Sequence, residues 1–288
     1  MGELKEGGKV ISLKHRQQRA VPKRVVAITS GKGGVGKTNL VANIGFSLVS
    51  MGKKTLVLDA DLGLGNIDVI LGLTPKYNLS HVVTGEKTLR EILVEGPGGL
   101  NILPAASGIE EMANLSRDKK LKILTELEDV MEDMDIVLID TAAGISSNVM
   151  YFNSVAQDIV VIVSPEPTSI TDAYAVMKLL FLKYRRDKFY LVSNFVRSVK
   201  EGTEIYRQLK LVTDKFLDID LKYLGQVFLD ENITICVKWQ KLLVKDYPES
   251  VASKCFMTLA ERLIALPQSK EASESGLVWH SLLNLNGT

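Results

Sequence analysis

The sequence predicts an α/β fold, with a doubly wound, mostly parallel sheet that carries helices on both faces. Hydrophobic segments of strand length alternate with longer segments whose apolar residues recur at helical spacing. The first strand runs through a glycine-rich loop into a helix, and two later strands end on an aspartate. Open α/β sheets bind ligands at the carboxyl ends of their strands, so these features should share one edge. We expect one large domain at 24–266, between a flexible leader at 1–23 and a linker with a C-terminal amphipathic segment at 267–288.

The glycine-rich loop joins a strand rich in β-branched residues to a helix predicted at 39–51. The loop consists of Gly31, Lys32, Gly33, Gly34, Val35, Gly36, Lys37 and Thr38. It matches G-x-x-x-x-G-K-[ST], in which backbone N–H groups and the N-terminus of the helix hold phosphates. Lys37 should reach the β and γ phosphates, Thr38 should bind Mg²⁺, and we count Asn39 with the nucleotide-binding residues. The sequence therefore predicts a nucleoside triphosphate site.

Aspartates at the ends of two predicted strands form a second group of candidate site residues. Asp59 ends its strand and Asp61 follows two residues later, so both carboxylates face the same side of the chain. One of them can support Mg²⁺ through water while the other orients an attacking water. Asp140 ends the other strand and should hold the water shell of Mg²⁺. Gly144 completes a D-x-x-x-G segment, where its N–H can meet the γ-phosphate.

The remaining elements follow from hydrophobic runs and helical periodicity. The predicted strands lie at 24–30, 54–59, 100–104, 135–140, 158–163, 189–194 and 223–228. The predicted later helices lie at 116–134, with Ser116 as its cap, at 170–184 and at 248–266. A turn containing Leu229 and Asp230 comes directly after the last predicted strand.

Composition and charge narrow the class of protein. Hydrophobic residues make up 46% of the chain and charged residues 24%, as in ordinary globular proteins. A net charge of +1 gives no overall attraction to nucleic acid, so we do not expect nucleic acid as a partner. The two cysteines, Cys236 and Cys255, form no C-x-x-C pair, which favours a reduced, cytoplasmic setting. The first twenty residues have no apolar core typical of a signal peptide, and no run of ~18 apolar residues predicts a membrane span.

Lys32, a second lysine directly after the first glycine of the loop, makes the motif resemble the deviant Walker A sequence of the MinD/ParA family, the signature-lysine ATPases. The resemblance implies an ATP-dependent homodimer in which Lys32 reaches the partner's nucleotide, with Asp61 as the catalytic aspartate. It also implies that Asp59 lies near the metal and that Asn194 and the turn at Leu229 and Asp230 lie near the adenine. The chain has no N-K-x-D guanine reader, which favours ATP and ADP over GTP. An ordinary phosphate loop with a solvated Lys32 stays open.

Within that family the chain most resembles the FlhG (FleN/YlxH) branch, through the segments 59–68, 140–146 and 165–174. This resemblance implies slow, partner-stimulated ATP hydrolysis and control of flagellar number or placement. The implied partners are the flagellar assembly GTPase FlhF or other polar or flagellar proteins, although the leader lacks the D-Q-A-x-x-L-R element of many FlhG proteins. A ParA-type DNA partition protein and a MinD-type regulator of the division site stay open as alternatives. An iron–sulphur carrier of the Mrp type would need paired cysteines, which this spacing does not offer.

The C-terminal segment returns to apolar character at 277–285, from Leu277 to Leu285. As a helix it would gather its apolar residues on one broad face, and the family uses such a helix as a reversible anchor at the inner face of the cell membrane. Its polar face lacks Lys and Arg, and Glu271 and Glu274 precede it, which weakens attraction to anionic lipid. Contact with the membrane and docking on the domain therefore both stay open.

Overall fold

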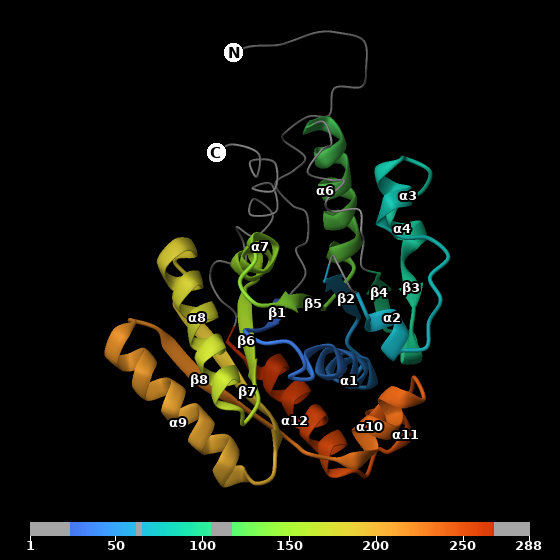
Figure 1. Cartoon of the computed structure of the whole chain (residues 1–288). Coiled ribbons are helices and arrows are strands. Elements are labelled where there is room, and N and C mark those ends of the chain that lie inside the picture. Colours follow the sequence, from blue (N-terminus) through green and yellow to red (C-terminus); the bar gives the residue numbers. More distant parts are fainter. Residues whose placement is uncertain (1–23, 62–64, 105–116, 268–288) are drawn as a thin grey trace, which may run out of the picture.

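The computed structural model describes residues 24–61, 65–104 and 117–267, with the side chains of 117–121 left aside. The predicted leader, the helix cap Ser116 and the segment 277–285 lie outside these residues. The described residues form one eight-stranded sheet flanked by helices (Figure 1). The predicted α/β class is confirmed.

The sheet has the strand order β3-β4-β2-β5-β1-β6-β7-β8. All neighbours pair in parallel except β3 and β4, which are antiparallel at one edge. The strands are β1 (Arg24–Ser30), β2 (Thr55–Ala60), β3 (Val94–Glu95), β4 (Asn101–Leu103), β5 (Ile136–Ala143), β6 (Asp158–Val163), β7 (Lys188–Val196) and β8 (Asp220–Phe228). All residues of β1, β2 and β6 are buried, which explains why these strands read as continuous hydrophobic runs and not as alternating patterns.

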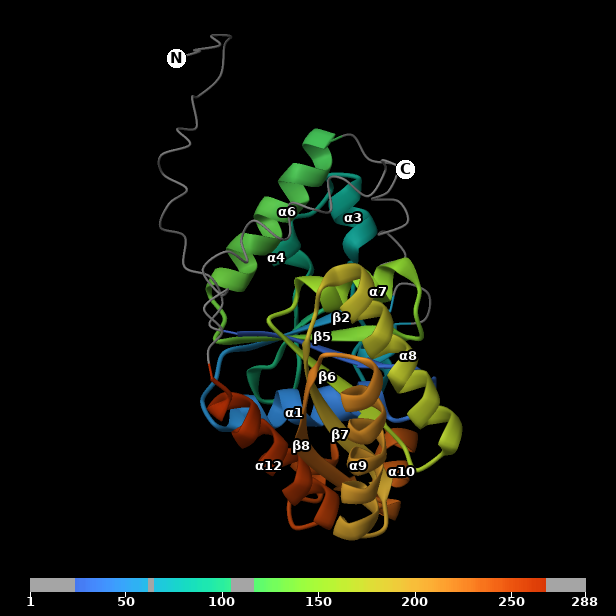
Figure 2. The same ribbon diagram turned by 90° about the vertical axis from the view of Figure 1, so that its left-hand side faces the viewer.

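Helices cover both faces of this sheet (Figures 1 and 2). The longer ones are α1 (Lys37–Ser50), α6 (Arg117–Glu132), α7 (Ser147–Val155), α8 (Pro167–Tyr184), α9 (Val199–Phe216), α10 (Glu231–Lys238) and α12 (Val251–Ala265). The short ones are α2 (Ile67–Ile70), α3 (Leu79–Val83), α4 (Leu89–Ile92), the 3₁₀ turn η2 (Pro97–Gly99) and α11 (Leu243–Asp246). None of the helices in the described ranges is both long and apolar enough to cross a membrane.

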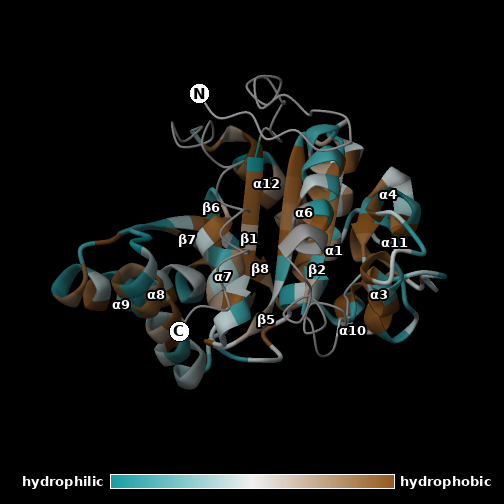
Figure 3. Ribbon diagram, turned by 90° about the horizontal axis from the view of Figure 1, so that it is seen from above, coloured by the Kyte–Doolittle hydropathy of each residue, from teal (hydrophilic) through white to brown (hydrophobic). Residues whose placement is uncertain are grey.

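Successive residues of β1 divide between two hydrophobic cores, as the alternation of a strand requires. Val26 and Ile28 pack with α1, α11 and α12, whereas Val25 and Ala27 pack with α3, α4, α6 and α7. A third cluster lies between β6, β7 and β8 and the helices α7, α8 and α9. Seen from above, hydrophobic strands occupy the middle of the molecule and helices of mixed character surround them (Figure 3).

The position of the site follows from the strand order, which changes direction at β1. From β1 the chain passes through α1 to β2 on one side, whereas β5 connects through α7 to β6 on the other side of β1. Ligands of open α/β sheets bind at such a reversal, outside the carboxyl ends of the strands. Ser30, the last residue of β1, marks this position.

Several boundaries differ from those predicted. β5 continues three residues past Asp140 to Ala143, because these residues still pair with β1 and β2. α8 begins at Pro167 and not at residue 170, since a proline in the first helical position has no N–H to leave unpaired. The elements predicted from the sequence do not include β3, α9, α10 or α11, although Ser198 caps α9 by accepting from the Glu201 N–H.

Candidate nucleotide-binding site

The phosphate loop lies between β1 and α1, at the carboxyl edge of the sheet centre. The helix begins at Lys37, two residues before the predicted start, and the Leu40 N–H donates to the Gly36 carbonyl. Gly34 and Gly36 have φ angles of 79° and 82°, in the region that favours glycine. The sequence motif is therefore in the strand–loop–helix setting that it requires.

Two glycines of the loop have neighbours too close to allow a side chain. A Cβ on Gly31 would lie 2.2 Å from the backbone carbon of Asp172 in α8. A Cβ on Gly36 would lie 2.5 Å from Nδ2 of Asn194, at the end of β7. The loop is thus held between α8 and β7, two elements far away in the sequence.

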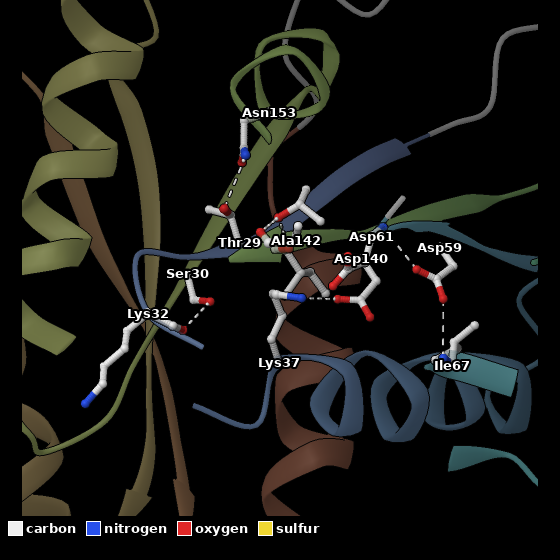
Figure 4. A network of polar contacts seen from close by, with 12 residues as sticks. Thr29, Ser30, Lys32, Lys37, Asp59, Asp61, Ile67, Asp140, Ala142 and Asn153 are labelled. Carbon is white, nitrogen blue, oxygen red and sulfur yellow. Dashed lines mark hydrogen bonds and ion pairs between the residues drawn. The ribbon is translucent and has the colours of Figure 1, made fainter. Parts of the chain in front are cut away.

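Lys37 and Asp140 form a buried ion pair at the centre of the site. Lys37 Nζ lies 2.7 Å from Asp140 Oδ1, and the two side chains are 8% and 1% exposed (Figure 4). The Thr38 hydroxyl donates a further hydrogen bond to Asp140. Burial raises the pKa of Asp140, and the Lys37 ammonium opposes this rise by favouring the carboxylate. Lys37, Thr38 and Asp140 therefore converge, as the motif predicts.

Asp59 lies beside Asp140, because the two residues pair across β2 and β5. Its oxygens accept hydrogen bonds from the backbone N–H groups of Asp61 (3.1 Å) and Ile67 (3.3 Å). Burial and the nearby charge of Asp140 together raise the pKa of Asp59 to about 7. The charge of Asp61 also raises the pKa of Asp140, so all three carboxyl groups are close enough to interact.

Lys32 points away from Lys37, toward the start of α8 (Figure 4). Its ammonium group donates to the Glu166 carboxylate and, at 3.1 Å, to Thr168 Oγ1. The Lys32 side chain is 38% exposed, so it lies at the surface of this single chain. Glu166 and Thr168 could not be predicted as its partners from the sequence, because no local pattern links residues so far apart in the chain.

Gly144 has a φ of 94° and lies at the end of the D-x-x-x-G segment. Its N–H donates to the Ser30 carbonyl at 2.9 Å. This is the N–H predicted to meet a γ-phosphate, so such a contact requires the bond to Ser30 to break. The bond links the segment after β5 directly to the start of the phosphate loop.

The residues predicted near the base differ in how freely they can reach a ligand. Asn194 is 3% exposed, its Nδ2 donates to the Val35 carbonyl at 2.7 Å, and its Oδ1 is buried without a partner among the described residues. Leu229 is 58% exposed. Asp230 caps α10 by accepting from the Asn232 N–H at 2.9 Å, and its other oxygen accepts from the Ala252 N–H. Asp230 therefore has a structural role whether or not it contacts a base.

The side chain of Asn39 points into the interior of the protein. It is 8% exposed, its Oδ1 accepts from Asn43 Nδ2 at 3.2 Å, and its Nδ2 is buried without a hydrogen-bond partner in the described ranges. Contact of this side chain with a nucleotide stays a prediction.

The donor set suits a nucleoside triphosphate with Mg²⁺. The unpartnered Asn194 Oδ1 is an acceptor for a base donor, and the loop has the lysine and positive-φ glycines of an anion cradle. Thr38 and Asp140 offer oxygen ligands, while the described ranges contain no cluster of three or more His, Cys, Asp or Glu side chains that could hold a metal. Mg²⁺ commonly binds through one or two protein oxygens together with water and substrate phosphates, so this sparse set is sufficient. The fold and the site define a P-loop nucleotide-binding protein.

Comparisons with known proteins agree with that class. A family model described as an AAA domain matches residues 23–185. Antiactivator FleN of Pseudomonas aeruginosa is 42% identical over 246 residues, which cover 85% of this chain and 88% of that protein. Flagellum site-determining protein YlxH of Helicobacter pylori is 35% identical over 243 residues, covering 84% and 82%. The structure of septum site-determining protein MinD from Pyrococcus horikoshii, complexed with Mg-ADP, superposes with a TM-score of 0.67 at 26% identity, covering 86% of this chain and 99% of that one. The chain belongs to the MinD/ParA family of P-loop ATPases, in the branch that includes FleN and YlxH.

Proposed function

We propose that this protein is an ATP-dependent dimerisation switch that controls flagellar number or placement. The observation that carries the proposal is a phosphate loop with two lysines that point in opposite directions: Lys37 lies against Asp140 inside the site, and Lys32 lies at the surface. One lysine can serve the nucleotide of its own chain while the other is available to a second chain. An ordinary phosphate loop needs only the first.

Each residue of the site has a separate role in ATP hydrolysis. Lys37 moves from Asp140 to the β and γ phosphates, and Asp61 orients the attacking water. Thr38 would bind Mg²⁺, and Asp59 and Asp140 would hold its water shell. When bound, Mg²⁺ neutralises phosphate charge. Slow turnover, stimulated by a partner, suits a switch that must remain in its ATP-bound state long enough to act.

Dimerisation requires Lys32 to change partners. In the single chain its ammonium group is held by Glu166 and Thr168, and in the dimer it would reach the nucleotide of the other protomer. A ligand shifts an equilibrium only through its different affinities for the two states, so the γ-phosphate must favour the dimer. The bond of the γ-phosphate with Lys32 of the other chain, which only the dimer offers, supplies that difference.

The biological role rests on the relatives. FleN is named as an antiactivator and YlxH as a flagellum site-determining protein, so we place this chain in flagellar regulation. Its partners would be a flagellar assembly GTPase or other polar or flagellar proteins, with nucleic acid not expected. The protein would be cytoplasmic and would contact the membrane reversibly through 277–285.

The test is light scattering of the purified chain with ATP or ADP, comparing wild type with three variants. Wild type should form dimers with ATP only, and Lys32→Ala should bind ATP yet stay monomeric. Asp61→Ala should form long-lived ATP dimers because hydrolysis is slowed, and Lys37→Ala, the control, should lose ATP binding itself. ATP-dependent dimers of Lys32→Ala that match wild type would refute the role of Lys32 across an interface. Normal ATP turnover by Asp61→Ala would refute its catalytic role.

A further inference from the structure

Phe195 has an unusual backbone conformation for an aromatic residue. Its φ is +60°, in the left-handed region that bulky side chains rarely adopt. The other non-glycine residues with positive φ in the described ranges, Arg185 and Gln240, lie at the ends of α8 and α10, where such turns are common. Phe195 lies within β7, so a helix end does not account for it.

The conformation coincides with an irregularity in the sheet. The pairing of β7 with β8 shifts between Ser193 and Val196, on either side of Phe195. Such bulges redirect a side chain and are common next to active sites. The redirected ring lies against the phosphate loop: its Cζ and Cε1 atoms are 2.7 and 3.4 Å from where a Cβ on Gly36 would be. The strained residue thus places an aromatic ring beside the loop that holds the phosphates.

The preceding residue presents a hydrogen-bond acceptor at the same place. Asn194 Nδ2 is committed to the Val35 carbonyl, so the carboxamide cannot turn over and its Oδ1 has a fixed direction. That oxygen is buried and has no partner among the described residues. A buried acceptor of this kind is costly unless a ligand donates to it. Asn194 and the half-buried ring of Phe195 therefore lie together beside Gly36, since the Asn194 carboxamide and the Phe195 ring both come within 2.7 Å of where a Cβ on Gly36 would be.

We propose that Phe195 is the platform on which the purine of the bound nucleotide stacks, while the exocyclic amine of adenine donates to Asn194 Oδ1. This inference rests on the proposed function and adds the residue that recognises the base. Aromatic side chains bind bases through their faces, whatever the base, so the ring supplies affinity and the acceptor supplies selection. Guanine would present a carbonyl oxygen to Asn194 Oδ1, and two acceptors facing each other disfavour GTP.

The experiment compares three ligands by calorimetry: ATP, GTP and inorganic triphosphate, which has phosphates but no base. Wild type should bind ATP more tightly than GTP. Phe195→Leu keeps an apolar side chain against Gly36 but removes the aromatic face, so it should bind ATP about tenfold more weakly and inorganic triphosphate unchanged. Phe195→Tyr, the matched control, keeps the face and should bind ATP like wild type. Thermal unfolding checks that each variant is folded.

The outcomes separate this inference from the proposed function. Wild type that binds neither ATP nor inorganic triphosphate would refute the proposed function. Wild-type affinity of Phe195→Leu for ATP would refute the platform and leave the switch intact. An equal loss of ATP and inorganic triphosphate would also overturn it, because the ring would then support the phosphate loop and not the base.

Discussion

Asp59 and Asp140 are paired residues on neighbouring strands, yet their surroundings differ. Asp140 has the Lys37 ammonium at 2.7 Å, whereas Asp59 accepts only backbone N–H groups within hydrogen-bond distance in the described contacts. One cation cannot neutralise two buried carboxylates, so the pair favours having a proton on Asp59. A bound cation would relieve the same repulsion, so the charges of this pair support the proposed metal site.

Asp59→Asn should change how stability depends on pH in nucleotide-free, metal-free protein. The folded pKa of Asp59, about 7, is above its ordinary value of 3.8. The folded state therefore retains a proton that the unfolded state releases, and this contribution to stability is complete below pH 3.8 and lost as pH rises through 7. It amounts to about 4 kcal/mol at most. Asparagine does not titrate, so the variant should lose much less stability over this range.

Urea unfolding at several pH values between the two pKa values measures this difference. The free energy of unfolding of the wild type, relative to that of Asp59→Asn, should fall as pH rises. Parallel pH profiles for the two proteins would show that Asp59 titrates in its ordinary range.

Helix α1, which begins at the phosphate loop, is connected to α11 through Asn43. This side chain is fully buried, and its Oδ1 accepts from the Val244 N–H of α11 at 3.1 Å. Its Nδ2 donates to the Asn39 carbonyl at 2.8 Å. A polar residue on the buried face of α1 is thus explained by a hydrogen bond to an element some 200 residues later in the chain.

Asn43→Ala should lower the free energy of unfolding by about 2 kcal/mol, because it leaves the Val244 N–H buried without an acceptor. Ser50→Ala is the matched control on the same helix: Ser50 is exposed and its hydroxyl bonds only to the Phe46 carbonyl in the described contacts. The control should change stability by less than about 0.5 kcal/mol. Urea unfolding checks both, and equal effects of the two substitutions would contradict the importance of the contact between α1 and α11.

The ends of the described domain meet at the edge of the sheet opposite the site. Arg24, the first residue of β1, forms a buried ion pair of 2.9 Å with Asp158 of β6. The Nη2 atom of Arg24 donates to the carbonyl of Leu266, just after α12. The phosphate loop follows the other end of β1. A segment attached after Leu266 therefore starts far from the nucleotide site. The proposed dimerisation would couple this segment to nucleotide binding, because it brings two copies of the segment together.

The proposed membrane contact is tested by flotation with anionic vesicles, using the full chain and a chain that ends at Pro267. The shorter chain retains the Leu266 carbonyl that Arg24 binds. Full-length protein should float with ATP and not with ADP, since two weak amphipathic segments in a dimer bind far more tightly than one. Truncation should abolish flotation while leaving the ATP dimer intact.

Fluorescence of Trp279 gives a second readout, with the truncated chain showing the background from Trp239. A blue shift on adding vesicles with ATP is expected. Failure of the full chain to float in any nucleotide state would make 277–285 a segment that docks on protein.

The sequence alone determined the features that depend on neighbours in the chain. The phosphate loop is recognisable because its glycines, Lys37 and Thr38 must be contiguous to surround one phosphate group. Asp59 and Asp140 were predicted at one edge because each ends a hydrophobic strand, and parallel strands end together. Hydrophobic runs located every strand of the sheet except the two-residue edge strand β3, and the amphipathic helix α9 was also missed.

Tertiary structure alone decided which distant groups touch. Lys32 with Glu166, Gly144 with Ser30 and Asn194 with Val35 are pairs that no local pattern links. The redirected ring of Phe195 likewise depends on how β7 pairs with β8. Such contacts follow from the order and register of the strands, which bring separate loops to one edge. Local sequence thus specifies the chemical groups of the site. The packing of the sheet specifies where these groups lie, which of them bond to other residues of the chain and which can reach a ligand.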